Sequence, residues 1–173
     1  MGLDMNLYRK LYYGGEYKTH EKDHEWKESH SLTIGGEFAD KYGIKVEDIS
    51  EIKIACGYWR KANQVHKFFC DSVNQPDLNG YARVSTANIV ELQNRCEVIL
   101  ETLNMTARKA ITDRVKEVAL DLLPPSEGFF FGSYEIDKYY MMDIKDTLEI
   151  CDKALDTPDE KEWSVSYEYF ASW

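Results

Sequence analysis

The sequence WSVSYEYFASW, residues 163–173, alternates between large apolar side chains and small or polar ones. Successive side chains of a β-strand point to opposite faces, so this alternation predicts a strand. One of its faces would carry Trp163, Val165, Tyr167 and Tyr169. The start of the chain, LDMNLYRKLYY at residues 3–13, alternates in the same way and predicts another strand, with one face formed by Leu3, Met5, Leu7 and Arg9.

The chain between these two strands is mostly helical in its pattern. Apolar residues recur at steps of three and four in four segments, 59–73, 85–103, 112–122 and 137–155. Two further strands are predicted at residues 31–38 and 47–57, where Gly57 is expected to end the second. Strands at both ends with helices between them predict an α+β fold, in which a small antiparallel sheet of N-terminal and C-terminal strands packs against about four helices.

Length and composition predict one domain. A chain of 173 residues with 43% hydrophobic residues can bury a core of its own, so we expect a single domain over residues 1–173, with a mobile polar excursion at 16–31. The four cysteines form no CxxC pair and are expected to be free thiols. The N-terminus lacks a signal-peptide pattern, and no segment is long and apolar enough to span a bilayer. These features predict a cytoplasmic protein that contacts no membrane and needs no cofactor.

The charge is acidic and unevenly distributed. The net charge is −10, and residues 133–173 contain eleven acidic and four basic side chains. Binding to duplex nucleic acid requires a basic face, so duplex DNA or RNA is not an expected partner. The acidity is explained either by solubility or by imitation of nucleic acid towards a basic partner protein.

The segment HEKDHEWKESH, residues 20–30, has the histidine spacing of a zinc peptidase, with His20, His24 and His30 as ligands and Glu21 as the base. Its context differs from that of such enzymes. Lys27 stands where a glycine normally allows the chain to turn, and Trp26 is the only large apolar residue of the segment. A solvated polar segment is therefore the expected state, and a metal-dependent hydrolase is the alternative.

Two other segments concentrate aromatic, polar and charged residues: GYWRKANQVHKFF at 57–69 and GFFFGSYEIDKYY at 128–140. The first is predicted to begin a helix with Trp59, Asn63 and His66 on one face. The second supplies glycines for close backbone approach and the N-terminus of a helix, which favours anions. Together they would suit a planar, anionic, nucleotide-like ligand. The candidate ligand-binding residues are Trp59, Arg60, Lys61, Asn63, His66, Phe131, Gly132, Ser133, Asp137 and Tyr140.

Each candidate also has a purely structural interpretation. A tryptophan at a strand-to-helix junction is often a core anchor, and His66 lies in an apolar stripe where a buried, hydrogen-bonded histidine is common. Arg60 and Lys61 would then pair with Asp137 and Glu135. The chain has no serine-hydrolase elbow, phosphate-binding loop, dinucleotide turn or kinase signature, so we expect no catalytic residue.

The opening MGLDM, the segment GYWRKANQVHKFF and the segment LLPPSEGFFFGSYEIDKYY resemble a family of uncharacterised small proteins of bacteriophages and prophages. The resemblance covers the N-terminus and residues 55–155, and it excludes the histidine-rich segment. It implies a phage setting in the host cell cytoplasm, where small acidic proteins without catalytic motifs often act on host defence. The expected function is therefore a non-enzymatic binding protein that sequesters a nucleotide-type signal or binds a basic host protein.

The aromatic tail raises the question of assembly. Helices with apolar stripes and a terminal strand leave apolar side chains and a strand edge to be covered. A homodimer would cover both. Alternatively, the tail lies within the sheet beside residues 3–13, and the domain is self-sufficient.

Overall fold

The computed structural model describes residues 2–12, 37–45, 49, 51–126, 132–156 and 165–173. Its elements are the strands β1 (Asp4–Tyr12), β2 (Glu51–Arg60), β3 (Gly80–Val84) and β4 (Val165–Ser172), with the helices α2 (Glu37–Tyr42), α3 (Asn63–Ser72), α4 (Thr86–Asn104), η2 (Ala107–Lys109), α5 (Asp113–Leu122) and α6 (Lys138–Leu155). The polar excursion at 16–31, with its three histidines, lies outside the described residues, as does Phe131.

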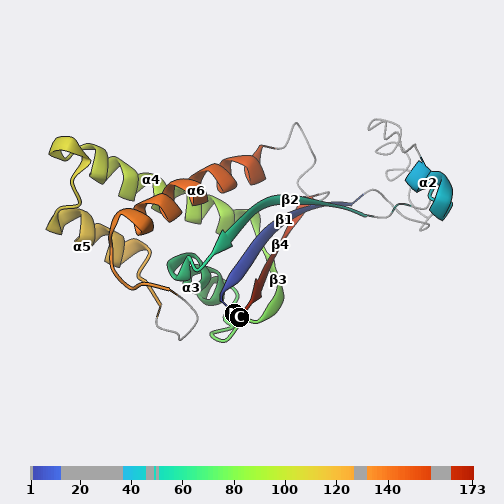
Figure 1. Cartoon of the computed structure of the whole chain (residues 1–173), viewed down its shortest axis with the longest axis horizontal. Coiled ribbons are helices and arrows are strands. Elements are labelled where there is room, and N and C mark those ends of the chain that lie inside the picture. Colours follow the sequence, from blue (N-terminus) through green and yellow to red (C-terminus); the bar gives the residue numbers. More distant parts are fainter. Residues whose placement is uncertain (1, 13–36, 46–48, 50, 127–131, 157–164) are drawn as a thin grey trace.

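The four strands form one antiparallel sheet in the order β2-β1-β4-β3. The N-terminal strand and the C-terminal strand are thus neighbours at its centre, as Figure 1 shows. The α+β prediction is confirmed, and so is the alternative in which the tail pairs with residues 3–13. The tail strand is interior, and the edges of the sheet are β2 and β3.

Helices α3, α4 and α6 lie against one face of the sheet (Figure 1). The strand residues that point towards them are buried, and those between them are half-buried or exposed. The core contains apolar side chains from both layers, among them Leu3, Met5, Phe69, Ile89 and Ile144. This one-sided burial is the reason for the strict alternation in the terminal strands.

The starts of α4, α5 and α6 agree closely with the sequence pattern, and a capping side chain marks each of them. The Ser85 hydroxyl accepts a hydrogen bond from the backbone N–H of Asn88, and the Asn88 side chain accepts one from the backbone of Ser85. The Thr112 side chain caps α5, and the carboxylate of Asp137 caps α6. These caps satisfy backbone donors that would otherwise lack partners at a helix start.

Three predictions of local structure were wrong. The end of the strand predicted at 31–38 is helical, because α2 begins at Glu37, and residues 31–36 are not described. Strand β2 does not end at Gly57 but continues to Arg60. The helix predicted from residue 59 begins at Asn63, and the short strand β3 was not predicted at all.

Candidate functional site

The junction between β2 and α3 brings the first motif to the surface. Lys61 has a positive φ of 63°, a conformation that reverses the chain between the strand and the helix. Its backbone N–H donates to the carbonyl oxygen of Leu3 over 2.8 Å, and its own carbonyl accepts from the N–H of Asn63 over 2.9 Å. This turn leaves the side chains of Arg60 and Lys61 exposed at the end of the sheet.

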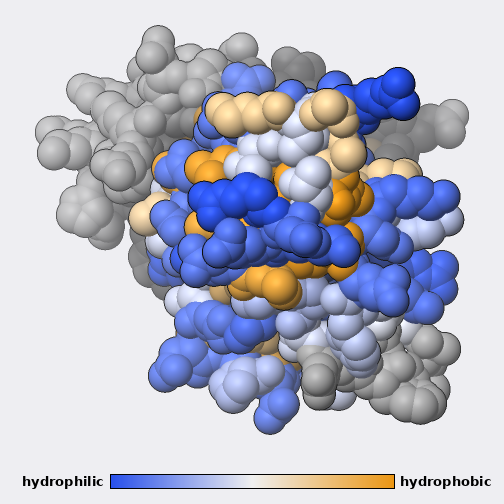
Figure 2. Space-filling model, turned by 90° about the vertical axis from the view of Figure 1, so that its left-hand side faces the viewer, coloured by the Kyte–Doolittle hydropathy of each residue, from blue (hydrophilic) through white to orange (hydrophobic). Residues whose placement is uncertain are grey.

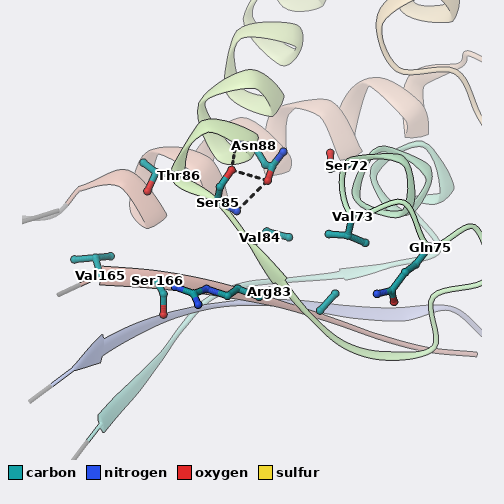
Figure 3. Close-up of a pocket in the computed structure, with 11 residues that line it drawn as sticks. Ser72, Val73, Gln75, Arg83, Val84, Ser85, Thr86, Asn88, Val165 and Ser166 are labelled. Carbon is teal, nitrogen blue, oxygen red and sulfur yellow. Dashed lines mark hydrogen bonds between the residues drawn. The ribbon is translucent and has the colours of Figure 1, made fainter. Parts of the chain in front are cut away.

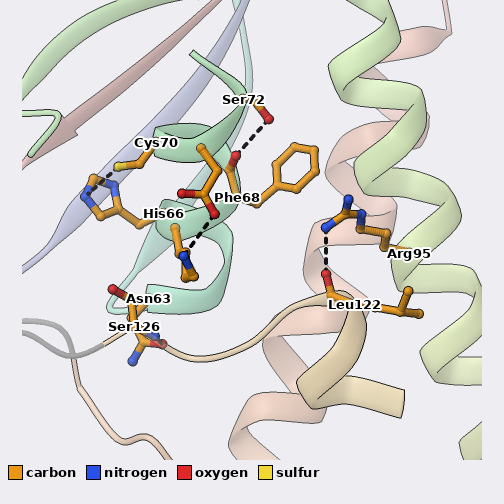
Figure 4. A network of polar contacts seen from close by, with 10 residues as sticks. Asn63, His66, Phe68, Cys70, Ser72, Arg95, Leu122 and Ser126 are labelled. Atoms are coloured by element: carbon orange, nitrogen blue, oxygen red, sulfur yellow. Dashed lines mark hydrogen bonds and ion pairs between the residues drawn. The ribbon is translucent and has the colours of Figure 1, made fainter. Parts of the chain in front are cut away.

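Asn63 joins the first motif to the segment that precedes α6. Its side-chain Nδ2 donates to the carbonyl oxygen of Ser133 over 2.8 Å. Its Oδ1 accepts from the backbone N–H of Ser126 over 3.1 Å, and Figure 4 shows Asn63 beside Ser126. Asn63 is 1% exposed, so these bonds replace water for a buried amide. Gly132 has a φ of 95°, and a Cβ there would lie 3.1 Å from the Lys61 carbonyl oxygen. A glycine is therefore required for this close approach.

A pocket of about 300 Å³ lies where the two motifs meet. Six of the ten candidate residues line it, namely Arg60, Lys61, Gly132, Ser133, Asp137 and Tyr140. Four residues that the sequence did not single out as ligand contacts complete the lining, namely Gln64, Glu135, Tyr139 and Asp143. Gln64, Glu135 and Tyr139 lie inside the two motifs, which was the signal available for them, whereas Asp143 on a long acidic helix was not distinguishable from its neighbours.

The electrostatics of the pocket are mixed. Arg60 and Lys61 supply two cations from the β2–α3 junction, and Glu135, Asp137 and Asp143 supply three carboxylates from α6 and the segment before it. Arg60 reaches Asp4 at 3.9 Å, a loose and exposed contact that leaves its guanidinium accessible. The predicted pairing of Arg60 and Lys61 with Glu135 and Asp137 is not among the ion pairs of the described residues.

The N-terminus of α6 is already occupied by an anion of the chain itself. The carboxylate of Asp137 accepts hydrogen bonds from the backbone N–H groups of Tyr139 at 2.8 Å and Tyr140 at 3.1 Å. The Ser133 hydroxyl accepts from the N–H of Glu135 over 3.1 Å. The cations of the pocket, rather than free helix amides, are therefore the groups available to a phosphate.

Asp143 is a half-buried carboxylate of the pocket. Burial raises its pKa, and the neighbouring charges of Asp146 and Asp137 act in the same direction, while a hydrogen bond from the side chain of Gln64 opposes them. Gln64 Nε2 lies 3.2 Å from Asp143 Oδ2. A ligand that donates a hydrogen bond or carries a positive charge would relieve this strain on the carboxylate.

Trp59 and His66 lie in the core rather than in the pocket lining. Trp59 is 3% exposed, and its Nε1 donates to the Thr147 hydroxyl over 2.9 Å. The predicted common face for Trp59, Asn63 and His66 is wrong, because Trp59 belongs to β2 and only the other two belong to α3. Tyr140 lines the pocket but is 5% exposed, and its hydroxyl donates inward to the carbonyl of Leu123 over 2.8 Å.

His66 belongs to a buried polar cluster. Its Nδ1 lies 2.9 Å from the Tyr169 hydroxyl, and its Nε2 lies 3.4 Å from the sulfur of Cys70. Burial lowers the pKa of the imidazole to about 4 and raises the pKa of the Cys70 thiol and of the Tyr169 hydroxyl. All three groups are thus neutral near pH 7, and they act as a structural link between α3 and β4.

A larger cavity of about 620 Å³ lies away from both motifs, between the end of α3, β3, the start of α4 and β4 (Figure 3). It is lined by hydroxyl, amide and aliphatic side chains, and Arg83 is its only charged residue. Ser85 and Asn88, which line it, already bond to each other in the α4 cap. It contains none of the ten candidate residues.

All four cysteines are buried free thiols. The described residues contain no group of histidine, cysteine and carboxylate side chains suited to a metal ion, while His20, His24 and His30 lie outside them. Within the same residues, no helix has the length and apolar character needed to cross a bilayer. Comparison with known proteins finds no matching family model, no matching curated protein and no matching solved structure.

Proposed function

We propose that this chain is a non-catalytic binding protein and that the pocket between β2, α3 and α6 holds a small nucleotide-type ligand. The observation that supports this proposal is the meeting of two motifs, about seventy residues apart, in one pocket that Asn63 and Gly132 hold together. Its volume of about 300 Å³ lies at the lower end of the range for ligand sites, which favours a mononucleotide or a small cyclic nucleotide.

The side chains of the pocket suggest where the phosphate and the base of such a ligand would bind. Arg60 and Lys61 are permanent cations and would hold phosphate oxygens. Asp143 has unused acceptor capacity and would accept from the N–H donors of a base edge. Tyr139 is 61% exposed beside them and offers a ring face on which a base can stack.

The phage resemblance supplies the setting of the proposal. A phage protein that removes a nucleotide signal from the host cytoplasm would counteract a defence system that depends on that signal. Sequestration requires binding and no bond cleavage, which agrees with a chain without a recognisable catalytic motif.

Titration calorimetry against a panel of cyclic and linear nucleotides tests the proposal. We expect one nucleotide to bind and to raise the unfolding temperature, and Arg60→Ala to abolish that rise. Arg83→Ala is the matched control, because Arg83 is an exposed arginine that lies outside this pocket and lines the larger cavity. Absence of heat across the whole panel would eliminate a nucleotide ligand, and loss of binding in Arg83→Ala but not in Arg60→Ala would place the nucleotide at Arg83 rather than in this pocket.

A basic host protein is the second candidate partner. The observation that favours it is the row of exposed carboxylates on α6, Asp146, Glu149 and Asp152. Affinity for a basic protein at this surface would fall steeply with salt, and Glu149→Lys would weaken it without affecting nucleotide binding. A host partner whose affinity is independent of salt would contradict this second assignment.

A further inference from the structure

The face of the sheet opposite the helices is open and has an unusual composition. Strand residues alternate, so the neighbours of the buried Met5, Leu7 and Tyr169 point away from the core. In an antiparallel sheet with one solvated face, these positions are normally polar. Here they include aromatic residues from all four strands, among them Tyr8, Tyr58, Phe170 and Tyr81.

Three of these rings lie in a single row across the sheet. The strand register places Tyr58 of β2 opposite Asn6 of β1, Asn6 opposite Phe170 of β4, and Phe170 opposite Tyr81 of β3. Neighbouring strands are about 4.8 Å apart, so the row extends over roughly 14 Å. Tyr58 and Tyr81, at its two ends, are 54% and 59% exposed. The row therefore presents an aromatic ring at each end and an amide between them.

The fourth ring, Tyr8, lies in the neighbouring row of the sheet, opposite Glu168 of β4. Lys53 Nζ lies 4.1 Å from the ring centroid of Tyr8 and 4.3 Å from that of Tyr81, and it forms an ion pair with Glu168. The Tyr81 ring also contacts the Phe170 ring, with centroids 4.5 Å apart. These cation–π and ring contacts hold the aromatic side chains in fixed positions on an exposed surface.

The open face differs in charge from the rest of the molecule. It carries the cations Lys10, Lys53, Arg60 and Arg83 and the carboxylates Asp4, Glu51 and Glu168. It therefore has a small positive charge when Arg60, which also lines the nucleotide pocket, is counted, in a chain whose net charge is −10. Arg83, on the edge strand, is exposed and forms no ion pair with any described residue. A short anionic partner can approach this face, whereas a long phosphate array would also meet the acidic surfaces.

We propose that the open face of the sheet binds a short stretch of single-stranded nucleic acid. Unpaired bases would stack on Tyr58 and on the Tyr81–Phe170 pair, and Asn6 between them can donate to and accept from base edges. Phosphates would contact Arg83, whereas the Lys10 ammonium already lies 2.9 Å from a carboxylate oxygen of Glu51 and 3.7 Å from one of Glu168. A duplex is not the expected occupant, because its bases are already stacked and cannot cover the exposed rings. The stacking residues of this site, Tyr58 and Tyr81, do not line the nucleotide pocket.

Fluorescence anisotropy with short labelled oligothymidylate and oligouridylate tests the proposal. We expect binding that weakens with salt, and a loss of affinity of about fivefold or more in Tyr58→Ala and in Tyr81→Ala, because stacking of a base on one ring contributes about 1–3 kcal/mol. Tyr81→Phe keeps the ring and should retain affinity. The matched control is Tyr42→Ala, which removes a 60% exposed tyrosine from α2. Circular dichroism of each variant establishes that it remains folded.

Three outcomes would overturn this assignment. The first is the absence of binding to either oligonucleotide at low salt, and the second is unchanged affinity in both alanine variants. The third is a dimer that Tyr81→Ala dissociates, which would show that this face of the sheet binds a second copy of the chain. Nucleotide binding in the pocket should persist in Tyr81→Ala, and oligonucleotide binding should persist when a nucleotide is absent, so the two sites can fail separately.

Discussion

His66 is the residue that should make the stability of this protein sensitive to acid. It is 2% exposed and lies among Tyr169, Cys70 and apolar side chains, where a positive charge would be poorly solvated. Burial lowers its pKa from the ordinary value of 6.5 to about 4. In the unfolded chain the imidazole takes up a proton below pH 6.5, while in the folded chain it stays neutral until about pH 4.

Acidification should therefore destabilise the folded state in a defined window. The contribution of His66 is fully present above pH 6.5 and is lost as the pH falls towards 4, by as much as about 3 kcal/mol. Urea unfolding at pH 7.0, 5.5 and 4.5 measures this loss. His66→Gln should be less stable at pH 7 but should show a smaller decrease over the window. If the variant lost as much free energy of unfolding over this window as the unmodified protein, the acid sensitivity would come from other groups.

The packing of β2 against α6 explains why Gly57 lies inside a strand. The register of β1 and β2 shifts between Leu7 and Tyr8, and the buried Cys56 is the extra residue of this bulge. A Cβ on Gly57 would lie 2.3 Å from Cγ1 of Ile150 on α6. The glycine therefore makes room for a helix side chain, and it neither forms a turn nor ends the strand.

Gly57→Ala should destabilise the protein by about 1–3 kcal/mol, the usual cost of overpacking a core. Chemical denaturation measures this loss in the free energy of unfolding. In an Ile150→Ala background the same substitution should cost clearly less, because the side chain that it would strike has been removed. Leu148→Ala, another half-buried position of α6, is the control and should give no such rescue. Additive costs in the Ile150→Ala pair would show that this contact is not the reason for the glycine.

The elements that could be predicted from sequence are those whose signals are local. Helices α4, α5 and α6 were found from apolar periodicity, and the structure shows that each of them begins at a capping side chain, Ser85, Thr112 and Asp137. The path of β2 through Gly57 depends on a side chain of α6, almost a hundred residues later. Strand β3 has five residues and pairs with the end of the chain, so its sequence carries little pattern of its own.

The candidate site was also predicted only in part, because some of its residues carry a local sequence signal and others do not. The two motifs were recognised by composition, and six of the ten candidate residues line one pocket. Trp59 was misplaced because its helical spacing to Asn63 was taken to continue across a strand end. Asp143 was missed because its importance comes from burial and from the nearby Gln64 and Asp137, which no local pattern reveals.

At the scale of the whole molecule, the position of β4 decides between a self-sufficient domain and a dimer formed through the tail. Strand β4 pairs with β1 on one side and with β3 on the other, so its backbone groups are satisfied within the chain. The end of the molecule formed by α4 and α5 is largely hydrophilic, with hydrophobic areas interspersed (Figure 2). Neither the strand edges of β4 nor this end of the molecule needs a second chain to cover it. We therefore expect light scattering to give the monomer mass of 20.2 kDa.

Deletion of residues 170–173 should then damage the fold rather than separate two chains. The deletion removes Ala171, which is fully buried and paired with both Met5 and Gly80, and it removes the Trp173 indole that donates to the Leu78 carbonyl over 3.2 Å. We expect the unfolding temperature to fall by more than about 5 °C, because several kcal/mol of ladder and core contacts are lost. Deletion of Trp173 alone keeps the strand pairing and should cost less. A full-length mass of twice 20.2 kDa that the longer deletion halves would instead place the tail between two chains.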